Sequence, residues 1–449
     1  MYDNLDFQRG VQANLNTIQV ASMPGMRKEL LAFGPGNTTV LVFEKSINCG
    51  SVPLPAEEMR LSMKQRYTVS LLLLTLVMVG CSQTTDEASA PESNAFEAQV
   101  EEYIQKFPYQ DSFEYAIRYT DGDPNKLNIW AFGTKPVLVK AGEDTVVRMN
   151  NDTYYKMAFV SLEDGAVVLE SNAPSKDRFS SFQLMDDRNV NYQNIIHPDG
   201  QYTLYHGDRP DQIQGEAIEV PSNLSVVIVR VELKDKNDPD DVEGAKTVFN
   251  GITITGRQPA EFPQVDLLSG FPEDVAAEAL RQLDEAFATI PFSQTVVGPG
   301  QEPGRDVPYL NHSAGTKGGW GGPDPAHSAY ETLFFDKNGD EMRGGKGSYT
   351  VTTEEPPVDA FWSITVYDTD RGGFFHPNKD DRYHINNTAA VRNDSGTVTF
   401  TFKQTCETSD RNCLEVPAGR FDLVARYYLP HAEIIAGEWT LPGIELESE

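Results

Sequence analysis

The sequence predicts a mainly β protein with two domains of sandwich or jelly-roll type and a short helical connector between them. Three observations lead to this class. The stretches 98–256 and 326–449 contain short runs rich in Val, Tyr and Phe, separated by Gly, Asn and Asp turn signals. The stretch 257–325 has a helical period and is rich in Gly and Pro. About 370 residues follow Cys81, which is enough for two domains with a core each.

Residues 63–81 have the layout of a bacterial lipoprotein signal peptide. A basic start is followed by an apolar run over 69–79, and a small residue and Cys81 close the segment. The run is shorter than the roughly 20 residues that a membrane-spanning helix needs. We expect cleavage before Cys81, which would then carry the lipid. A buried core helix is the less favoured alternative, because an acidic segment typical of a flexible tether follows over 82–97.

A signal peptide works at an N-terminus, so Met63 is the expected start of the protein. Residues 1–62 are then a mis-called or vestigial upstream segment, and the alternative is a genuine cytoplasmic extension before an ordinary membrane helix. The expected location is the cell envelope of a Gram-negative bacterium. Ser82 after the cysteine, in place of Asp, resembles lipoproteins that are sorted to the outer membrane.

Cys406 and Cys413 are predicted to form a disulfide. They enclose a short polar loop, and neither a C-x-x-C spacing nor further ligands for a metal lie nearby. A disulfide is typical of an oxidising compartment, so it agrees with export.

The net charge of -30, from 67 acidic and 37 basic residues, excludes nucleic acid as the expected partner. Signatures of a nucleophile elbow, a zinc protease, a P-loop and a dinucleotide fold are absent from the sequence. The segment 336–341 (DKNGDE) has alternating oxygen ligands but fails the EF-hand spacing, so a β-turn is the favoured interpretation. We therefore expect no metal site and no cofactor.

The strands of the first domain are expected within 146–164, 165–171 and 224–233, and the domain ends near Thr255. A helix follows over 272–290, with Leu280, Leu283, Phe287 and Ile290 on its apolar face and Pro272 at its first position. Five strands are expected in the second domain, within 330–336, 347–354, 359–368, 396–404 and 420–429.

The motifs resemble two families of unknown function. NNDTYY at 150–155, GAVVLES and KDRFSSFQLMDD at 176–187 are similar to domain of unknown function 1254. PPVDAFWSITVYD, DDRYHIN, CLEVPAGRFDLVARYYLP and GEWTLPGIE, between 356 and 445, are similar to domain of unknown function 1214. The resemblance implies two antiparallel β-sandwich domains, jelly-roll-like, with a helical connection. It implies no known reaction, and the family usually has Trp where this chain has Cys413.

Candidate ligand-binding residues lie inside these motifs: Asp152, Thr153, Arg178 and Asp186 in the first domain, and Trp320, Tyr367, Arg382 and Tyr383 beyond it. An arginine among carboxylates can clamp an anionic or hydroxyl-rich ligand. A structural network that fixes strand ends is the favoured interpretation of the first group. Trp362 alternates with apolar residues and is expected in the core, whereas Tyr367, Arg382 and Tyr383 are expected to be exposed.

Three functions remain open. The preferred one is a lipid-anchored envelope protein that binds a carbohydrate or another envelope component. The second is a hydrolase of glycans or glycopeptides, which would need Asp152 and Asp186 about 5–10 Å apart in one cleft. The third is a structural component of an envelope assembly. The sequence leaves catalysis, the ligand and the oligomeric state open.

Overall fold

The structure is a computed structural model that describes residues 90–144, 147–407 and 409–447. From Glu92 onward the chain forms one compact unit. The predictions for residues 1–62, for the signal peptide, for Cys81 and for the first part of the tether lie outside the described residues. Within the described ranges, the helices are too short or too polar to cross a membrane.

The first domain is a sandwich of two four-stranded sheets. Its strands are β1 (Thr153–Ser161), β2 (Val167–Ser171), β3 (Ser180–Asp186), β4 (Asn191–Ile196), β5 (Gly200–Tyr205), β6 (Glu216–Glu219), β7 (Leu224–Glu232) and β8 (Ile252–Gly256). The inner sheet has the order β1-β7-β3-β4 and the outer sheet β6-β5-β2-β8. Phe182 and Val229 of the inner sheet share one apolar core with Leu169 and Leu204 of the outer sheet.

The second domain repeats this plan. Its strands are β9 (Ser328–Leu333), β10 (Tyr349–Thr353), β11 (Trp362–Asp368), β12 (His384–Asn386), β13 (Val398–Lys403), β14 (Cys413–Glu415), β15 (Phe421–Tyr428) and β16 (Glu445–Leu446). The inner sheet is β12-β11-β15-β9 and the outer sheet β14-β13-β10-β16. Trp362 lies in the core between them, as expected. The two mainly β domains are confirmed, and the jelly-roll-like connection of their strands stays a prediction.

The pairing is antiparallel apart from β5 with β6 and β13 with β14, which are parallel. The inner strands differ from the outer ones in burial. β13 alternates between buried and half-buried residues, as a strand with one solvated face does. β7, β11 and β15 are buried at every position. Both faces of the inner sheets are therefore covered, one by the partner sheet of the same sandwich and the other by a further part of the chain.

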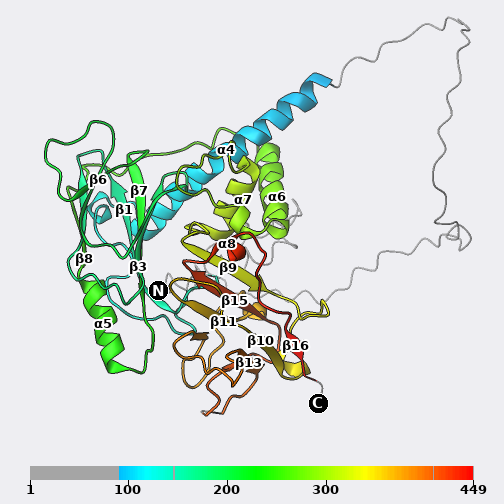
Figure 1. Cartoon of the computed structure of the whole chain (residues 1–449). Coiled ribbons are helices and arrows are strands. Elements are labelled where there is room, and N and C mark those ends of the chain that lie inside the picture. The colour runs from blue at the N-terminus through cyan, green and yellow to red at the C-terminus, as the bar shows by residue number, and fades with distance from the viewer. Residues whose placement is uncertain (1–89, 145–146, 408, 448–449) are drawn as a thin grey trace, which may run out of the picture. The chain divides into compact units, whose positions relative to one another are not determined.

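Five α-helices of the described residues accompany the strands. They are α4 (Ala90–Thr120), α5 (Pro239–Asn250), α6 (Glu273–Thr289), α7 (Tyr309–Gly319) and α8 (Ala432–Ile435). Two of them, α6 and α7, lie in the chain between the two sandwiches. Val100 and Ile104 of α4 pack with Leu283 of α6 and Ala314 of α7, and Figure 1 shows α4 running past these two helices. Further along α4, Phe113 packs on the inner sheet of the first sandwich.

The N-terminal boundary differs from the expectation. Residues from Ala90 belong to α4, so the expected tether ends earlier than residue 97 and the first strand begins only at Thr153. The acidic, Ala-rich composition that was interpreted as a tether is also compatible with a helix, because Ala and Glu are strong helix formers. The packing of one face of α4 on α6 and α7 stabilises that conformation.

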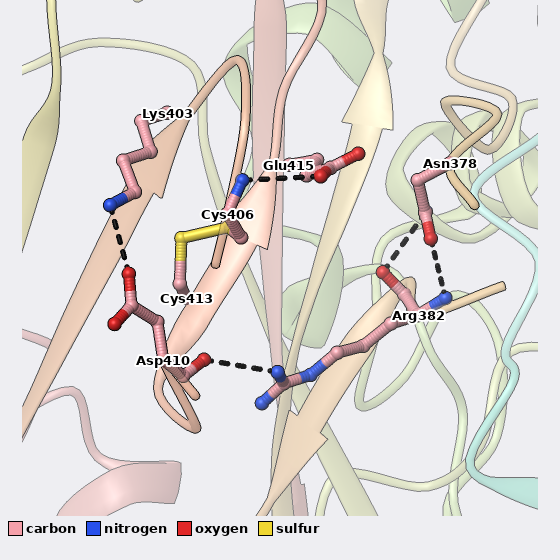
Figure 2. The surroundings of a disulfide bond; sticks show 7 residues. All are labelled: Asn378, Arg382, Lys403, Cys406, Asp410, Cys413 and Glu415. Atoms are coloured by element: carbon pink, nitrogen blue, oxygen red, sulfur yellow. Dashed lines mark hydrogen bonds and ion pairs between the residues drawn. A yellow bond between two sulfur atoms is a disulfide. The ribbon is translucent and has the colours of Figure 1, made fainter. Parts of the chain in front are cut away.

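The loop closed by Cys406 and Cys413 contains the predicted disulfide, with Cα atoms 5.8 Å apart. Figure 2 shows the polar contacts around it: Asp410 pairs with Lys403, and its carbonyl accepts a hydrogen bond from Arg382. The 336–341 segment is a turn, as predicted. Gly339 has φ +84°, and the Asp336 carboxylate accepts backbone N–H groups of Asn338 and Asp340.

Candidate functional site

The two inner sheets face each other through polar side chains, which is unusual for the buried face of a sheet. We call this set the interdomain polar layer. Its members are Asp152, Thr153, Tyr155, Ser181 and Arg230 from the first sandwich, and His327, Ser328, Tyr330, Ser363, Thr365, Tyr367, Arg426 and Tyr428 from the second. All except Tyr155 and Tyr330 are buried, and these two are half-buried.

Strand registers place these residues on common faces. Arg230 of β7 lies opposite Tyr155 of β1 and Ser181 of β3. In the second sandwich, Arg426 of β15 lies opposite Ser363 of β11 and Tyr330 of β9. Residues that are directly opposite in a sheet project to the same side. Each inner sheet therefore presents one central arginine among hydroxyl groups.

Asp152 joins the two halves of the layer. It lies just before β1, where its backbone N–H donates to the side-chain oxygen of Asn150 at 2.7 Å. Its carboxylate accepts hydrogen bonds from the hydroxyls of Ser363 at 2.5 Å and Tyr428 at 3.0 Å. Two neutral hydroxyl donors hold this carboxylate, and the residue is buried from water. The carboxylate is therefore a fixed hydrogen-bond acceptor at the junction of the two sheets.

The two arginines flank Tyr330. Arg230 donates to the Tyr155 hydroxyl at 3.2 Å and to the Gln183 side-chain oxygen at 2.6 Å. Arg426 donates to the hydroxyls of Thr365 and Tyr367 and to the carbonyl of Arg148, and its guanidinium lies 5.3 Å from the Tyr330 ring centroid. Burial raises the pKa of the Tyr330 hydroxyl. The guanidinium groups of Arg230 and Arg426 both act to lower this pKa, because a nearby positive charge favours the phenolate.

Several buried atoms of the layer have no hydrogen-bond partner among the described residues. They are the hydroxyl oxygens of Thr153, Ser181 and Ser328, the Nε of Arg426, and both ring nitrogens of His327. Burial lowers the pKa of His327 to about 3, with a further contribution from Arg230. The imidazole is therefore neutral and has one donor and one acceptor unused. Buried polar groups are normally paired, so a cluster of unpaired ones indicates a place for a bound molecule or ordered water.

The structure brings three of the predicted site residues into this layer: Asp152, Thr153 and Tyr367. Tyr367 was expected to be exposed, and this expectation is wrong, because β11 is covered on both faces and the Tyr367 hydroxyl donates to the Met149 carbonyl at 2.6 Å. Arg178 lies elsewhere. It pairs with Asp241 of α5 at 2.5 Å and donates to the Glu232 carbonyl, so it fixes α5 to the end of β7.

Asp186 is remote from Asp152. Asp152 precedes Thr153, which pairs with Glu232 at one end of β7, whereas Asp186 pairs with Ser225 at the other end. At about 3.3 Å per residue, the two carboxylates are roughly 23 Å apart. This pair cannot act on one glycosidic bond, which needs carboxylates about 5–10 Å apart.

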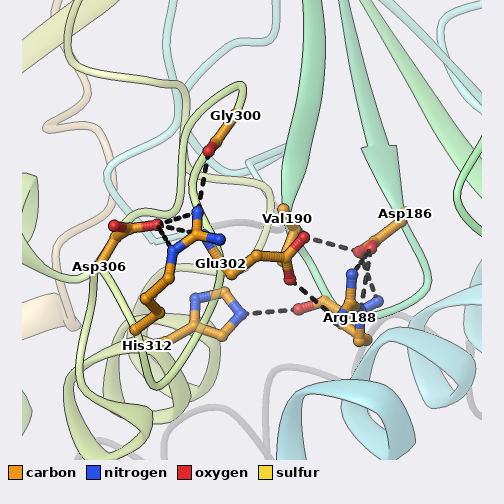
Figure 3. Close-up of polar contacts among 8 residues, drawn as sticks. Asp186, Arg188, Val190, Gly300, Glu302, Asp306 and His312 are labelled. Carbon is orange, nitrogen blue, oxygen red and sulfur yellow. Dashed lines mark hydrogen bonds and ion pairs between the residues drawn. The ribbon is translucent and has the colours of Figure 1, made fainter.

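Figure 3 shows what Asp186 does instead. Its carboxylate accepts the backbone N–H groups of Arg188 and Val190 and pairs with the Arg188 guanidinium at 2.7 Å. The Arg188 side chain also reaches Glu302, and its carbonyl lies 2.8 Å from Nε2 of the buried His312. Asp186 therefore organises the turn between β3 and β4, in agreement with the structural role that the sequence favours.

The remaining predicted residues have local partners. The Trp320 indole donates to the Ser112 hydroxyl and stacks on Tyr115 at 4.3 Å, so it fastens α4 to the end of α7. Arg382 is half-buried and donates to the Asp410 carbonyl. Tyr383 was expected to be exposed but is buried, because its ring stacks on Phe375 and its hydroxyl is bonded to Asp381 and to the Ala141 N–H.

The sequence interpretation missed the arginines at the centre of the layer. Arg230 stands in LSVVIVRVEL and Arg426 in FDLVARYY, each as the one basic residue of a largely apolar strand that also contains one carboxylate, Glu232 or Asp422. A charge inside a strand that is otherwise largely apolar on both faces is a signal of a buried polar site, since unpaired burial of a charge is costly.

Other candidate sites are weaker. A groove of about 700 Å³ between α4, α6 and α7 is lined by Phe96, Val100, Ile104, Leu310 and other residues, with Glu97, Glu101 and Glu278 among them. It lies on the helices and has no contact with the polar layer. In the described part of the chain, no group of three His, Cys, Asp or Glu side chains could hold a metal ion.

Fold and site together define a protein of two β-sandwiches with a charged, hydroxyl-rich layer between them. The family models agree with this division. Residues 131–256 match the model of the family DUF1254, and residues 327–432 match the model of the family DUF1214. Both families are described as proteins of unknown function. The chain therefore belongs to the proteins that carry a DUF1254 domain followed by a DUF1214 domain. Every residue of the interdomain polar layer lies inside one of the two matched ranges.

Among solved structures, the chain is similar to the VPA0106 protein of Vibrio parahaemolyticus. The identity is 18% and the TM-score 0.66, over 79% of this chain and 100% of that one. This likeness shows a shared fold. An uncharacterized protein of Burkholderia cenocepacia matches with 13% identity and a TM-score of 0.42, over 81% of this chain and 91% of that one. No curated protein matches the chain.

Proposed function

We propose that this protein is an exported, lipid-anchored envelope protein that binds a small ligand between its two β-sandwiches. The observation that carries the binding role is the set of unpartnered polar atoms in the interdomain polar layer. Leaving a buried polar group unpaired costs about 1–3 kcal/mol. Several such groups lie together on the two inner sheets. This layer is therefore better suited to binding a polar molecule than to direct packing of one sheet on the other.

The envelope location is supported by two features of the sequence. The lipoprotein-like signal at 63–81 would place a lipid on Cys81, and the Cys406–Cys413 disulfide is typical of a protein that folds in an oxidising compartment. Ser82 favours the outer membrane as the destination.

Processing can be tested in the native host. Intact-mass analysis of the envelope protein is expected to find a chain that begins at Cys81 and carries acyl groups, and Cys81→Ala is expected to remain unlipidated. Cys49→Ala serves as the control and should be processed normally. Peptides from residues 1–62 in the envelope protein would contradict the proposal.

Binding can be tested on mature protein by thermal denaturation with envelope glycans, glycopeptide fragments and small organic acids. A ligand of the layer is expected to raise the melting temperature of the wild type. Ser328→Ala removes one unpartnered hydroxyl and should weaken binding roughly two- to tenfold, the usual contribution of one hydrogen bond. Ser395→Ala, the same change on an exposed turn, should have no effect. Equal responses of both variants would place the ligand elsewhere.

A further inference from the structure

Most of the unpartnered atoms of the interdomain polar layer can donate a hydrogen bond. The Arg426 Nε–H can only donate, and the neutral His327 ring has one N–H. The hydroxyls of Ser181 and Ser328 can donate or accept. A molecule that satisfies the Arg426 Nε–H and the His327 N–H must supply acceptor atoms, and the unpartnered hydroxyls can donate to it as well.

The charges of the buried side chains also favour a ligand that supplies acceptor atoms. Three arginines that flank these sheets have carboxylate partners: Arg148 pairs with Asp422, Arg178 with Asp241 and Arg188 with Asp186. Arg230 is 3% exposed, yet among the described residues it bonds only the neutral side chains of Tyr155 and Gln183.

The carboxylates of Glu232 and Asp152, which belong to the same region as Arg230, form hydrogen bonds with other groups. Glu232, two residues along β7 from Arg230, accepts the backbone N–H of Phe179 at 3.0 Å. Asp152 is bonded to Ser363 and Tyr428, and it balances at most one of the two arginines. One buried positive charge of the layer is therefore without a fixed negative partner, which is costly in a folded protein.

Aromatic rings lie beside His327 and Tyr428 of the layer. Phe361 stacks on Tyr428 with centroids 4.0 Å apart, and Phe179 lies 5.2 Å from Tyr428 and 5.7 Å from His327. These rings provide an apolar wall beside the donors. Tyr155, whose hydroxyl accepts a hydrogen bond from Arg230, and Tyr330 are only half-buried.

Resting on the proposed function, we infer that the ligand is a small organic monocarboxylate with an apolar body. Its carboxylate pairs with Arg230, with His327 and Ser181 as further donors, and its body lies against the aromatic rings. One unbalanced positive charge suits a monoanion better than a phosphate monoester, which carries about two negative charges. A guanidinium can bind a carboxylate through two parallel hydrogen bonds.

The test is calorimetric titration of mature protein with four monocarboxylates (acetate, hexanoate, benzoate and indole-3-acetate), with benzamide as the neutral analogue and with inorganic phosphate. At least one carboxylate with an apolar body is expected to bind, and benzamide and phosphate at least about tenfold more weakly, since a charged pair contributes about that factor. Binding of none of the four carboxylates, or equal binding of benzoate and benzamide, would overturn the inference.

Variants of Arg230 give a second readout. Arg230→Met should weaken carboxylate binding at least about tenfold and raise the melting temperature of the unliganded protein, because an uncompensated buried charge is removed. Arg230→Lys should keep part of the affinity. Arg281→Met, on the exposed side of α6, is the control and should change neither quantity. Unchanged affinity in Arg230→Met would overturn the inference. If Arg230→Met does not fold, the benzoate and benzamide comparison on the wild type decides.

The inference and the proposed function can fail separately. Native mass spectrometry of protein taken from the envelope without unfolding reports any molecule that co-purifies. A neutral sugar bound in the layer would overturn the carboxylate and leave the binding role in place. A protein that binds no probe and co-purifies with nothing would overturn both.

Discussion

Asp422 of β15 and Arg148 before β1 form the best-defined charged contact between the two sandwiches. The Asp422 side chain is fully buried. It accepts two hydrogen bonds from the Arg148 guanidinium, at 2.9 and 3.0 Å, and one from the Thr369 hydroxyl at 2.7 Å. A buried carboxylate with three donors leaves few alternative positions for the two domains.

Asp422→Asn is therefore expected to destabilise the protein by about 2 kcal/mol, because charged hydrogen bonds of a buried carboxylate contribute about this much. Urea denaturation of both proteins at pH 7 measures the difference. Asp381→Asn is the matched control: Asp381 also contacts the other domain, through Lys140, but both side chains are exposed and the change should be far smaller. Equal losses in the two variants would contradict this account.

His327 is expected to make stability depend on pH. Burial lowers the pKa of His327 to about 3 and that of His384 to about 4, both from the usual histidine value of 6.5. The unfolded chain therefore binds protons below pH 6.5 that the folded chain does not, so stability is full above this value and is lost as the pH falls toward 3–4.

The variant His327→Gln places a polar side chain where the imidazole lies, and this side chain does not titrate. Between pH 6 and pH 5 the wild type should lose about 1 kcal/mol more stability than this variant. Urea denaturation at the two pH values, on both proteins, provides the comparison. Parallel losses would show that His327 is not held neutral in the folded protein.

At the scale of elements, α6 shows how tertiary packing selects the buried face. The predicted face contained Leu280, Leu283, Phe287 and Ile290, yet the buried residues are Val275, Ala279, Leu283 and Ala286. Phe287 is 39% exposed. Leu280 and Ile290 pack partly against the core cluster that contains the buried residues. The buried face is therefore displaced from the expected one toward the small residues Ala279 and Ala286, on the side where α6 contacts α7.

This displacement of the buried face predicts unequal costs for two truncations. Leu283→Ala should destabilise the protein by about 3 kcal/mol, as removal of a buried leucine side chain does. Phe287→Ala removes a larger side chain but should cost less than half as much, because much of that ring is already in contact with water. Thermal or urea denaturation of the two variants decides, and a reversed order would contradict the orientation of α6.

The strands were more predictable than the helices. All five strands expected in the second domain are present, because alternation and turn signals are local properties of the sequence. The helix α7 was missed because it lies in a Gly-rich stretch, where five of its residues are buried against other elements. Its conformation depends on contacts that no local pattern records.

At the scale of the whole molecule, the polar layer was only partly predictable. Asp152, Thr153 and Tyr367 were selected from motifs, but Arg230 and Arg426 were not, and Asp186 and Arg178 proved to have structural roles. The layer exists because two sandwiches place their inner sheets face to face. Residues far apart in the sequence, such as Asp152 and Tyr428, meet only in that arrangement.

The same arrangement couples the two domains. Side chains of the inner sheet of the second sandwich donate hydrogen bonds to the Asp152 carboxylate and to the carbonyls of Met149 and Arg148. Every layer residue falls within a DUF1254 or DUF1214 match. Each inner sheet therefore covers buried polar groups of the other, which explains in physical terms why each domain would need the other.

The most direct test of the binding role is a high-resolution crystal structure of mature protein purified from the envelope without unfolding. We expect electron density for an organic molecule between the inner sheets, in contact with Arg230 and with the unpartnered atoms of His327, Ser181 and Ser328. Ordered water alone at these atoms, both in this crystal and after soaking with the binding panel, would contradict this expectation.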